Sequence, residues 1–106
     1  MKIRYTYFVT TIRVIDEEDP REQYVDNRQR TPAFFSNLKD AKICLKENWG
    51  DIHECDFNYA VIEKTTYGVY PFSKKEYWYK WSNTKQMFIS TKKPNCFRNI
   101  CSFSVG

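Results

Sequence analysis

Leucine is nearly absent from this chain, and that shortage constrains the fold more than any other feature of the sequence. Only Leu38 and Leu45 are leucines among 106 residues, whereas phenylalanine, tyrosine and tryptophan together make up 18%. Helical bundles depend on leucine to fill their interior, but aromatic and β-branched residues fit the pleated surface of a sheet. Aromatic side chains also bury a large area with few torsions to freeze. We therefore expect a sheet with an aromatic core, in a single domain over residues 1–106, because a chain of this length builds one core.

Five segments have the composition or alternation of strands, and a sixth is weaker. They are residues 2–15, 31–35, 57–62, 76–81, 86–90 and 102–105. In the first, the apolar positions change from odd to even near Val9, which predicts a bulge or a change of environment. Pro32 assigns the second to a sheet edge, where a missing N–H is tolerated. Residues 57–62 are apolar on both faces, as in a central strand, and residues 82–85 supply a hairpin turn.

One amphipathic helix is predicted over residues 38–48. Asn37 and Asp40 have the spacing of an N-terminal cap. Gly50 can adopt the left-handed conformation that ends a helix. The apolar face of this helix comprises Leu38, Ala41, Leu45 and Trp49. The sequence thus predicts an α+β fold: an antiparallel sheet of four to six strands with one amphipathic helix packed on one face.

The net charge of +4 conceals an asymmetry along the chain. Residues 64–106 contain eight lysines and arginines against one acid, Glu76, which gives this portion a charge of +7. No apolar run is long enough to cross a bilayer and no signal-peptide core follows Met1, so we expect a cytoplasmic protein without a membrane partner. In that reducing compartment the four cysteines are expected to be thiols, with two disulfides as the alternative.

The single histidine, His53, lies in the connection between the helix and the central strand. Without a second imidazole nearby, it is expected to be a partly exposed loop residue. The alternative is a zinc site in which His53 and Cys55 join Cys96 and Cys101, because zinc prefers thiolate and imidazole ligands. These spacings differ from those of zinc knuckles, and the three glycines form no phosphate-cradling loop. We therefore expect no metal, no cofactor and no catalytic residue, which predicts that the protein is not an enzyme.

Bases and aromatic residues are interleaved from Lys64 onward, and this mixture predicts an anion-binding surface. Lysines attract phosphates, and aromatic faces stack on bases. The candidate ligand-binding residues are Arg28, Arg30, Tyr77, Trp78, Lys80 and Trp81. Lysine prevails over arginine in this region, and the acidic residues 16–26 would repel a long polyanion, which favours a small anionic nucleotide-like ligand over nucleic acid. A solvated basic sheet face over an aromatic core is the purely structural alternative.

Several short segments resemble small single-domain proteins of Gram-positive bacteria and their phages. The segments are residues 33–35 (AFF), 47–54 (ENWGDIHE), 58–63 (NYAVIE) and 78–81 (WYKW). The resemblance implies a phage accessory protein of the anti-defence type that acts in the host cytoplasm, and it assigns no catalytic residue. Such a protein would sequester a nucleotide signal or, alternatively, bind a host defence protein directly. A small single-stranded nucleic-acid-binding module is a third hypothesis, and exposed aromatic residues are compatible with a homo-oligomer.

Overall fold

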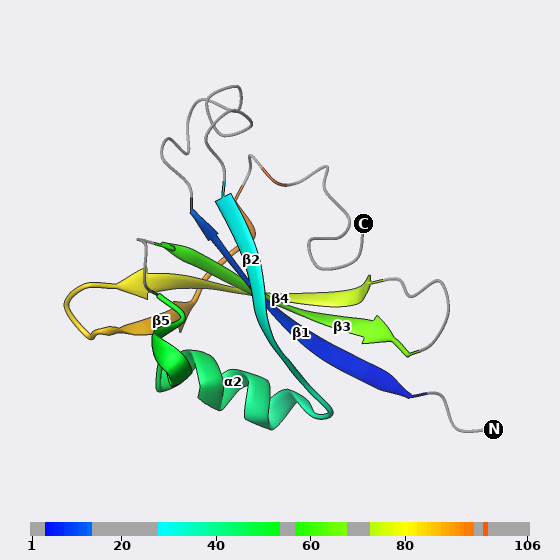
Figure 1. The fold of residues 1–106 in the computed structure, drawn as a ribbon. Helices are drawn as coiled ribbons and strands as arrows, with labels where there is room; N and C mark the ends of the chain where they lie inside the picture. Colours follow the sequence, from blue (N-terminus) through cyan, green and yellow to red (C-terminus); the bar gives the residue numbers. More distant parts are fainter. Residues whose placement is uncertain (1–3, 14–27, 54–56, 68–72, 95–96, 98–106) are drawn as a thin grey trace.

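One antiparallel sheet of five strands and one α-helix make up the described part of the chain in the computed structural model (Figure 1). The described residues are 4–13, 28–53, 57–67, 73–94 and 97. The strands are β1 (Tyr5–Arg13), β2 (Arg28–Phe35), β3 (Tyr59–Thr66), β4 (Ser73–Ser82) and β5 (Met87–Ser90). Helix α2 (Leu38–Lys46) is followed by the short 3-10 helix η1 (Trp49–Asp51). The predicted α+β class, with a single helix on an antiparallel sheet, is confirmed.

The strands lie in the order β2-β1-β3-β4-β5, and every neighbouring pair is antiparallel. Helix α2 connects β2 to β3, which β1 separates in the sheet, and lies along one face of the sheet (Figure 1). β3 is the middle strand, as its apolar sequence predicts, and β2 is an outer strand, as Pro32 predicts. Of the described helices, none is long and apolar enough to cross a membrane.

A bulge in β2 lies where the sequence of β1 changes phase. β1 pairs with β3 without interruption, but its pairing with β2 shifts between Val9 and Thr11. Thr31 and Pro32 of β2 together stand opposite Thr10, so the extra residue belongs to the outer strand. The two threonine hydroxyls lie 3.0 Å apart. The odd-to-even change in β1 therefore reflects burial of both its faces, since β1 itself keeps a regular alternation.

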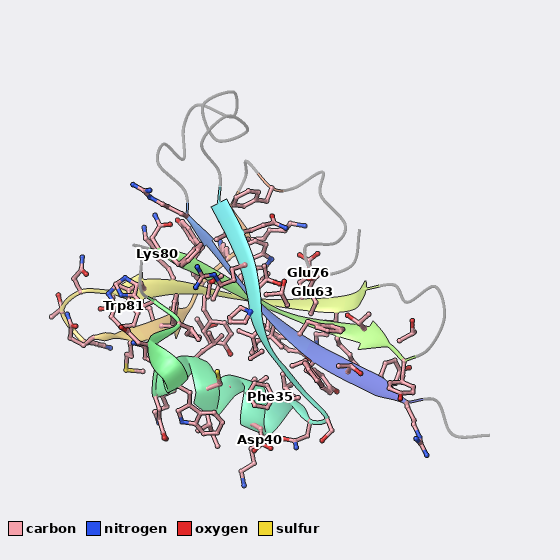
Figure 2. All side chains as sticks on the ribbon, in the orientation of Figure 1. Phe35, Asp40, Glu63, Glu76, Lys80 and Trp81 are labelled. Atoms are coloured by element: carbon pink, nitrogen blue, oxygen red, sulfur yellow. The ribbon has the colours of Figure 1, made fainter. Side chains whose placement is uncertain are left out.

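The face of the sheet under α2 contains the larger cluster of buried apolar side chains. Its members are Val9, Ala41, Leu45, Ala60, Ile62 and Phe88. α2 contributes Ala41, Cys44 and Leu45, which are all buried, so the predicted apolar stripe of the helix is largely confirmed. Phe35 of β2 also packs against this cluster, on the α2 side of the sheet (Figure 2).

The start of α2 agrees with the prediction, but its end does not. The predicted cap is present, because the backbone N–H of Asp40 donates to Asn37 Oδ1 at 2.8 Å. The helix ends two residues earlier than predicted, because Asn48 takes the left-handed conformation directly after the last turn, at φ 50°. Gly50 is also left-handed, at φ 63°, but it lies inside η1. Trp49 consequently leaves the helical stripe and is 41% exposed.

The opposite face of the sheet also contains a cluster of buried side chains. Its cluster consists of Ile12, Tyr59, Val61, Trp78 and Phe97. Phe97 stacks on Trp78 with ring centroids 5.7 Å apart and planes 13° apart. Burial of both faces explains why residues 57–62 lack a polar alternation. The predicted strand at 102–105 lies outside the described residues. The polar sequence of residues 16–31, with Pro20, predicts a long connection, but β2 already begins at Arg28, and residues 16–27 lie outside the described part.

Candidate functional site

The four predicted ligand residues of β4 do not share one surface. Because side chains alternate along a strand, Tyr77 and Trp81 face α2, whereas Trp78 and Lys80 face the other side. Trp78 is only 5% exposed and stacks on Phe97, so it belongs to the buried cluster of that face. Lys80 is exposed, and its ammonium lies 5.5 Å from the ring centroid of Tyr59.

The two predicted arginines belong to β2. Arg30 is exposed, and its guanidinium carbon lies 5.5 Å from the ring centroid of Phe57. Arg28 pairs with Arg13 at the start of β2, and its side chain lies outside the described part. β1 and β3 separate β2 from β4, which at the usual strand spacing amounts to about 14 Å. The predicted residues therefore lie in separate places, and ligand binding by any of them stays a prediction.

His53 is held against Trp81, in the half-buried loop position that the sequence predicts. The two rings stack with centroids 3.7 Å apart and planes 9° apart. The backbone N–H of His53 donates to Asn48 Oδ1 at 3.1 Å. Cys55, Cys96 and Cys101, the other members of the alternative zinc set, lie outside the described residues, and the residues described contain no group of three side chains that could hold a metal ion.

A hollow of about 430 Å³ lies at the end of the sheet where β1 begins and β3 ends. Its lining consists of Arg4, Tyr5, Thr6, Phe34, Ser36 and Tyr67. Phe34 is 70% exposed and Tyr67 is 68% exposed, and they are the two most exposed large apolar side chains of the described residues. Two large exposed rings that gather around one hollow make it the candidate site of the described residues.

The strands fix the position of each ring around the hollow. Phe34 stands in register with Phe8 across the β1–β2 pair, and their ring centroids are 6.1 Å apart. Thr6 and Phe8 share the face of β1 that points away from α2, so the hollow opens on that face. Tyr67 is held beside β1 because its backbone N–H donates to the carbonyl of Arg4 at 3.1 Å.

The chemistry of the hollow combines two strongly exposed aromatic rings, Phe34 and Tyr67, with the guanidinium of Arg4. Aromatic rings stack on planar ligands, and the Arg4 guanidinium can donate paired hydrogen bonds to a phosphate or carboxylate. The sequence does not predict this site, because Arg4, Phe34 and Tyr67 come from three separate segments that only the strand register brings together. The one available signal is the Phe34–Phe35 pair on an outer strand, since alternation must turn one of these rings away from the core.

The chain matches no known protein family, no curated protein and no solved structure. The resemblance to small phage-associated proteins therefore stays a prediction from the sequence.

Proposed function

We propose that this protein is a non-catalytic binding protein whose hollow takes a small anionic nucleotide-like ligand. The proposal rests on one observation: the two most exposed aromatic rings of the described residues, Phe34 and Tyr67, line the same hollow as Arg4. A nucleobase would stack against the rings, and Arg4 would bind the phosphate. The volume, about 430 Å³, falls in the range of small-molecule sites.

Two described carboxylates outside the hollow, Asp40 and Glu76, serve structural contacts, which supports a non-catalytic role. Asp40 accepts a hydrogen bond from the Asn37 amide at 3.0 Å. Glu76 accepts from the Trp78 indole at 2.9 Å and pairs with Lys93 at 3.0 Å. In the phage setting implied by the resemblance, such a protein would act by sequestering a nucleotide signal of host defence.

The first test is to identify what the protein carries from cells. Protein purified from phage-infected, defence-positive cells would be heated, and the released material analysed by mass spectrometry together with its absorbance at 260 and 280 nm. We expect a nucleotide in stoichiometric amount.

Variants of the hollow then test where that nucleotide binds. Tyr67→Ala should weaken binding by about 5-fold to 150-fold, because one base stacking on one ring contributes about 1–3 kcal/mol. Trp49→Ala is the matched control, since Trp49 is an exposed aromatic residue outside the hollow and its loss should leave the dissociation constant unchanged. Calorimetric titration with the released nucleotide measures both values. Equal losses in the two variants would exclude the hollow as the site.

Direct binding of a host defence protein is the second candidate function. It is favoured by the same exposed rings, because clustered aromatic side chains often dominate the energy of protein interfaces. Phe34 also lies on an outer strand, where a partner has access. Under this alternative the purified protein carries no nucleotide, and Phe34→Ala loses a purified partner that the Trp49→Ala control retains.

A further inference from the structure

The pairing of β3 with β4 places like charges directly opposite each other. Lys64 faces Lys75, and in the adjacent row Glu63 faces Glu76. Like charges at opposed positions of a sheet destabilise it. A shift by one residue would create one cross-strand ion pair, Glu63 with Lys75 or Lys64 with Glu76. It would also turn every core side chain of one strand to the wrong face. The core therefore enforces this register, and the lysines lie on one face and the glutamates on the other.

The glutamate row lies on the face away from α2 (Figure 2). Glu63 is fully buried there, and Glu76 pairs with Lys93 at 3.0 Å. The lysine row lies on the α2 face and is different. Within the described part of the chain, no carboxylate lies within ion-pairing distance of Lys64 or Lys75.

Tyrosine rings hold the two lysines in place of carboxylates. The Lys64 ammonium lies 4.3 Å from the ring centroid of Tyr5, and the Lys75 ammonium lies 5.0 Å from that of Tyr77. A third lysine, Lys42, reaches the same Tyr77 ring from α2, at 5.5 Å. These five residues form what we call the lysine–tyrosine patch. Lys42 and Lys75 are exposed and Lys64 is half-buried, so the patch is open to solvent.

Three cations held in this way resemble a preformed site for a compact anion. Each ring fixes the direction of a side chain that would otherwise be mobile, so less conformational entropy is lost when an anion binds. An anion with several negative oxygens would also remove the repulsion between the opposed lysines. A single carboxylate carries too little charge to satisfy three ammonium groups, which favours phosphate chemistry.

We propose that the lysine–tyrosine patch is a second binding site, for the oligophosphate group of a compact ligand. It does not depend on the proposed function of the hollow, because Lys64 and Lys75 face α2 whereas Phe34 and Thr6 face the other side of the sheet. Tyr5 borders both places, but its ring lies under Lys64. The oligophosphate could be free or part of a nucleoside triphosphate.

The test uses inorganic tripolyphosphate as the probe and the full chain as the protein. Lys64→Gln with Lys75→Gln should weaken its binding about tenfold or more, since charge-assisted hydrogen bonds contribute at least the 1.4 kcal/mol that a tenfold change represents. Lys85→Gln with Lys92→Gln is the matched control, because it removes the same charge from exposed positions outside the patch. We expect the control to change the dissociation constant by less than about twofold, because substitutions at exposed positions outside a site usually change free energies by less than about 0.5 kcal/mol.

A second variant separates loss of binding from loss of folding. Lys75→Glu places a carboxylate opposite Lys64, so it should maintain or raise the melting temperature while it removes tripolyphosphate binding.

Equal binding of tripolyphosphate and a nucleoside triphosphate indicates a site for the phosphates alone, and tighter binding of the nucleotide indicates a nucleotide site. Both support the proposal. Three results would overturn the proposal. The wild-type protein could fail to bind millimolar tripolyphosphate, the Lys85→Gln, Lys92→Gln control could lose as much affinity as the patch variant, or a single-stranded oligonucleotide could bind much more tightly than tripolyphosphate. Phe34→Ala should leave tripolyphosphate binding intact, which keeps this outcome separate from that of the hollow.

Discussion

Burial controls the chemistry of Cys44, the thiol on the inner side of α2. Its side chain is 1% exposed, and desolvation raises the pKa of this thiol above its ordinary range. The sequence predicts this position, because Cys44 adjoins the apolar stripe of the helix. A thiol in such a place behaves as a small apolar side chain, so we expect it to resist alkylation while the protein is folded.

The raised pKa of Cys44 makes the stability of the fold depend on alkaline pH. Above the ordinary thiol pKa of about 8.5, the unfolded state loses this proton while the folded state keeps it. The free energy of unfolding should therefore be fully maintained below that pH and should fall as pH rises toward the folded-state pKa, by at most about 1.4 kcal/mol per pH unit for one proton.

Urea denaturation of wild-type protein and Cys44→Ala between pH 8 and pH 10 measures this effect. The variant should show a flatter dependence on pH. Burial and the neighbouring Tyr77 also raise the pKa of Tyr79, but Tyr79 is present in both proteins, so the difference isolates the thiol. Identical pH dependences would contradict the prediction.

At the scale of elements, α2 shows which boundaries a sequence can predict. Its start follows from a local signal, Asn37 three residues before Asp40. Its end depends on a competition between two residues that can both adopt positive φ. The Asn48 side chain donates to Asp51 at 3.0 Å and accepts from the His53 N–H. These contacts favour the left-handed conformation at Asn48, so the helix ends before Asn48 and does not continue to Gly50. Glycine is the better residue for this conformation in general, so residue preference alone predicts the wrong position.

The cap of α2 gives a prediction about the stability of this element. Asn37→Ala should lower the free energy of unfolding by about 1 kcal/mol, because it removes the acceptor for the Asp40 N–H. Asn37→Ser keeps a side-chain oxygen at this position and should recover most of that loss. Urea denaturation followed by circular dichroism measures both, and equal stability of the alanine and serine variants would count against a capping role.

At the scale of the whole molecule, long-range contacts determine which of the predicted surface residues are exposed and which are buried. The alternation of β4 follows from its sequence, but the burial of Trp78 does not, because it depends on Phe97 reaching the face opposite α2. The sequence likewise does not predict the candidate hollow, since the hollow depends on the register between the strands. Local patterns thus predict the strands, the helix and the fold class, whereas the candidate site arises from pairings between distant segments.

Phe97 should accordingly stabilise the molecule as a core residue would. Phe97→Ala should lower the free energy of unfolding by about 3 kcal/mol, because it opens the cluster around Trp78. It should also increase the quenching of tryptophan fluorescence by acrylamide. Ile89→Ala is the control, since Ile89 is 37% exposed and its loss should change stability by less than about 0.5 kcal/mol. Similar effects of the two substitutions would contradict this role of Phe97.

The bulge at Thr31–Pro32 also affects how copies of this molecule behave toward one another. An outer strand is a template on which another chain can add a strand, and such additions repeat into fibres. Pro32 offers no N–H to an incoming strand, and the bulge disturbs the regular spacing that such a strand would need. The other outer strand, β5, has only four residues. Both edges of the sheet are thus poor templates for the addition of strands from other copies. We therefore expect the folded protein to resist aggregation through its sheet edges even at high concentration.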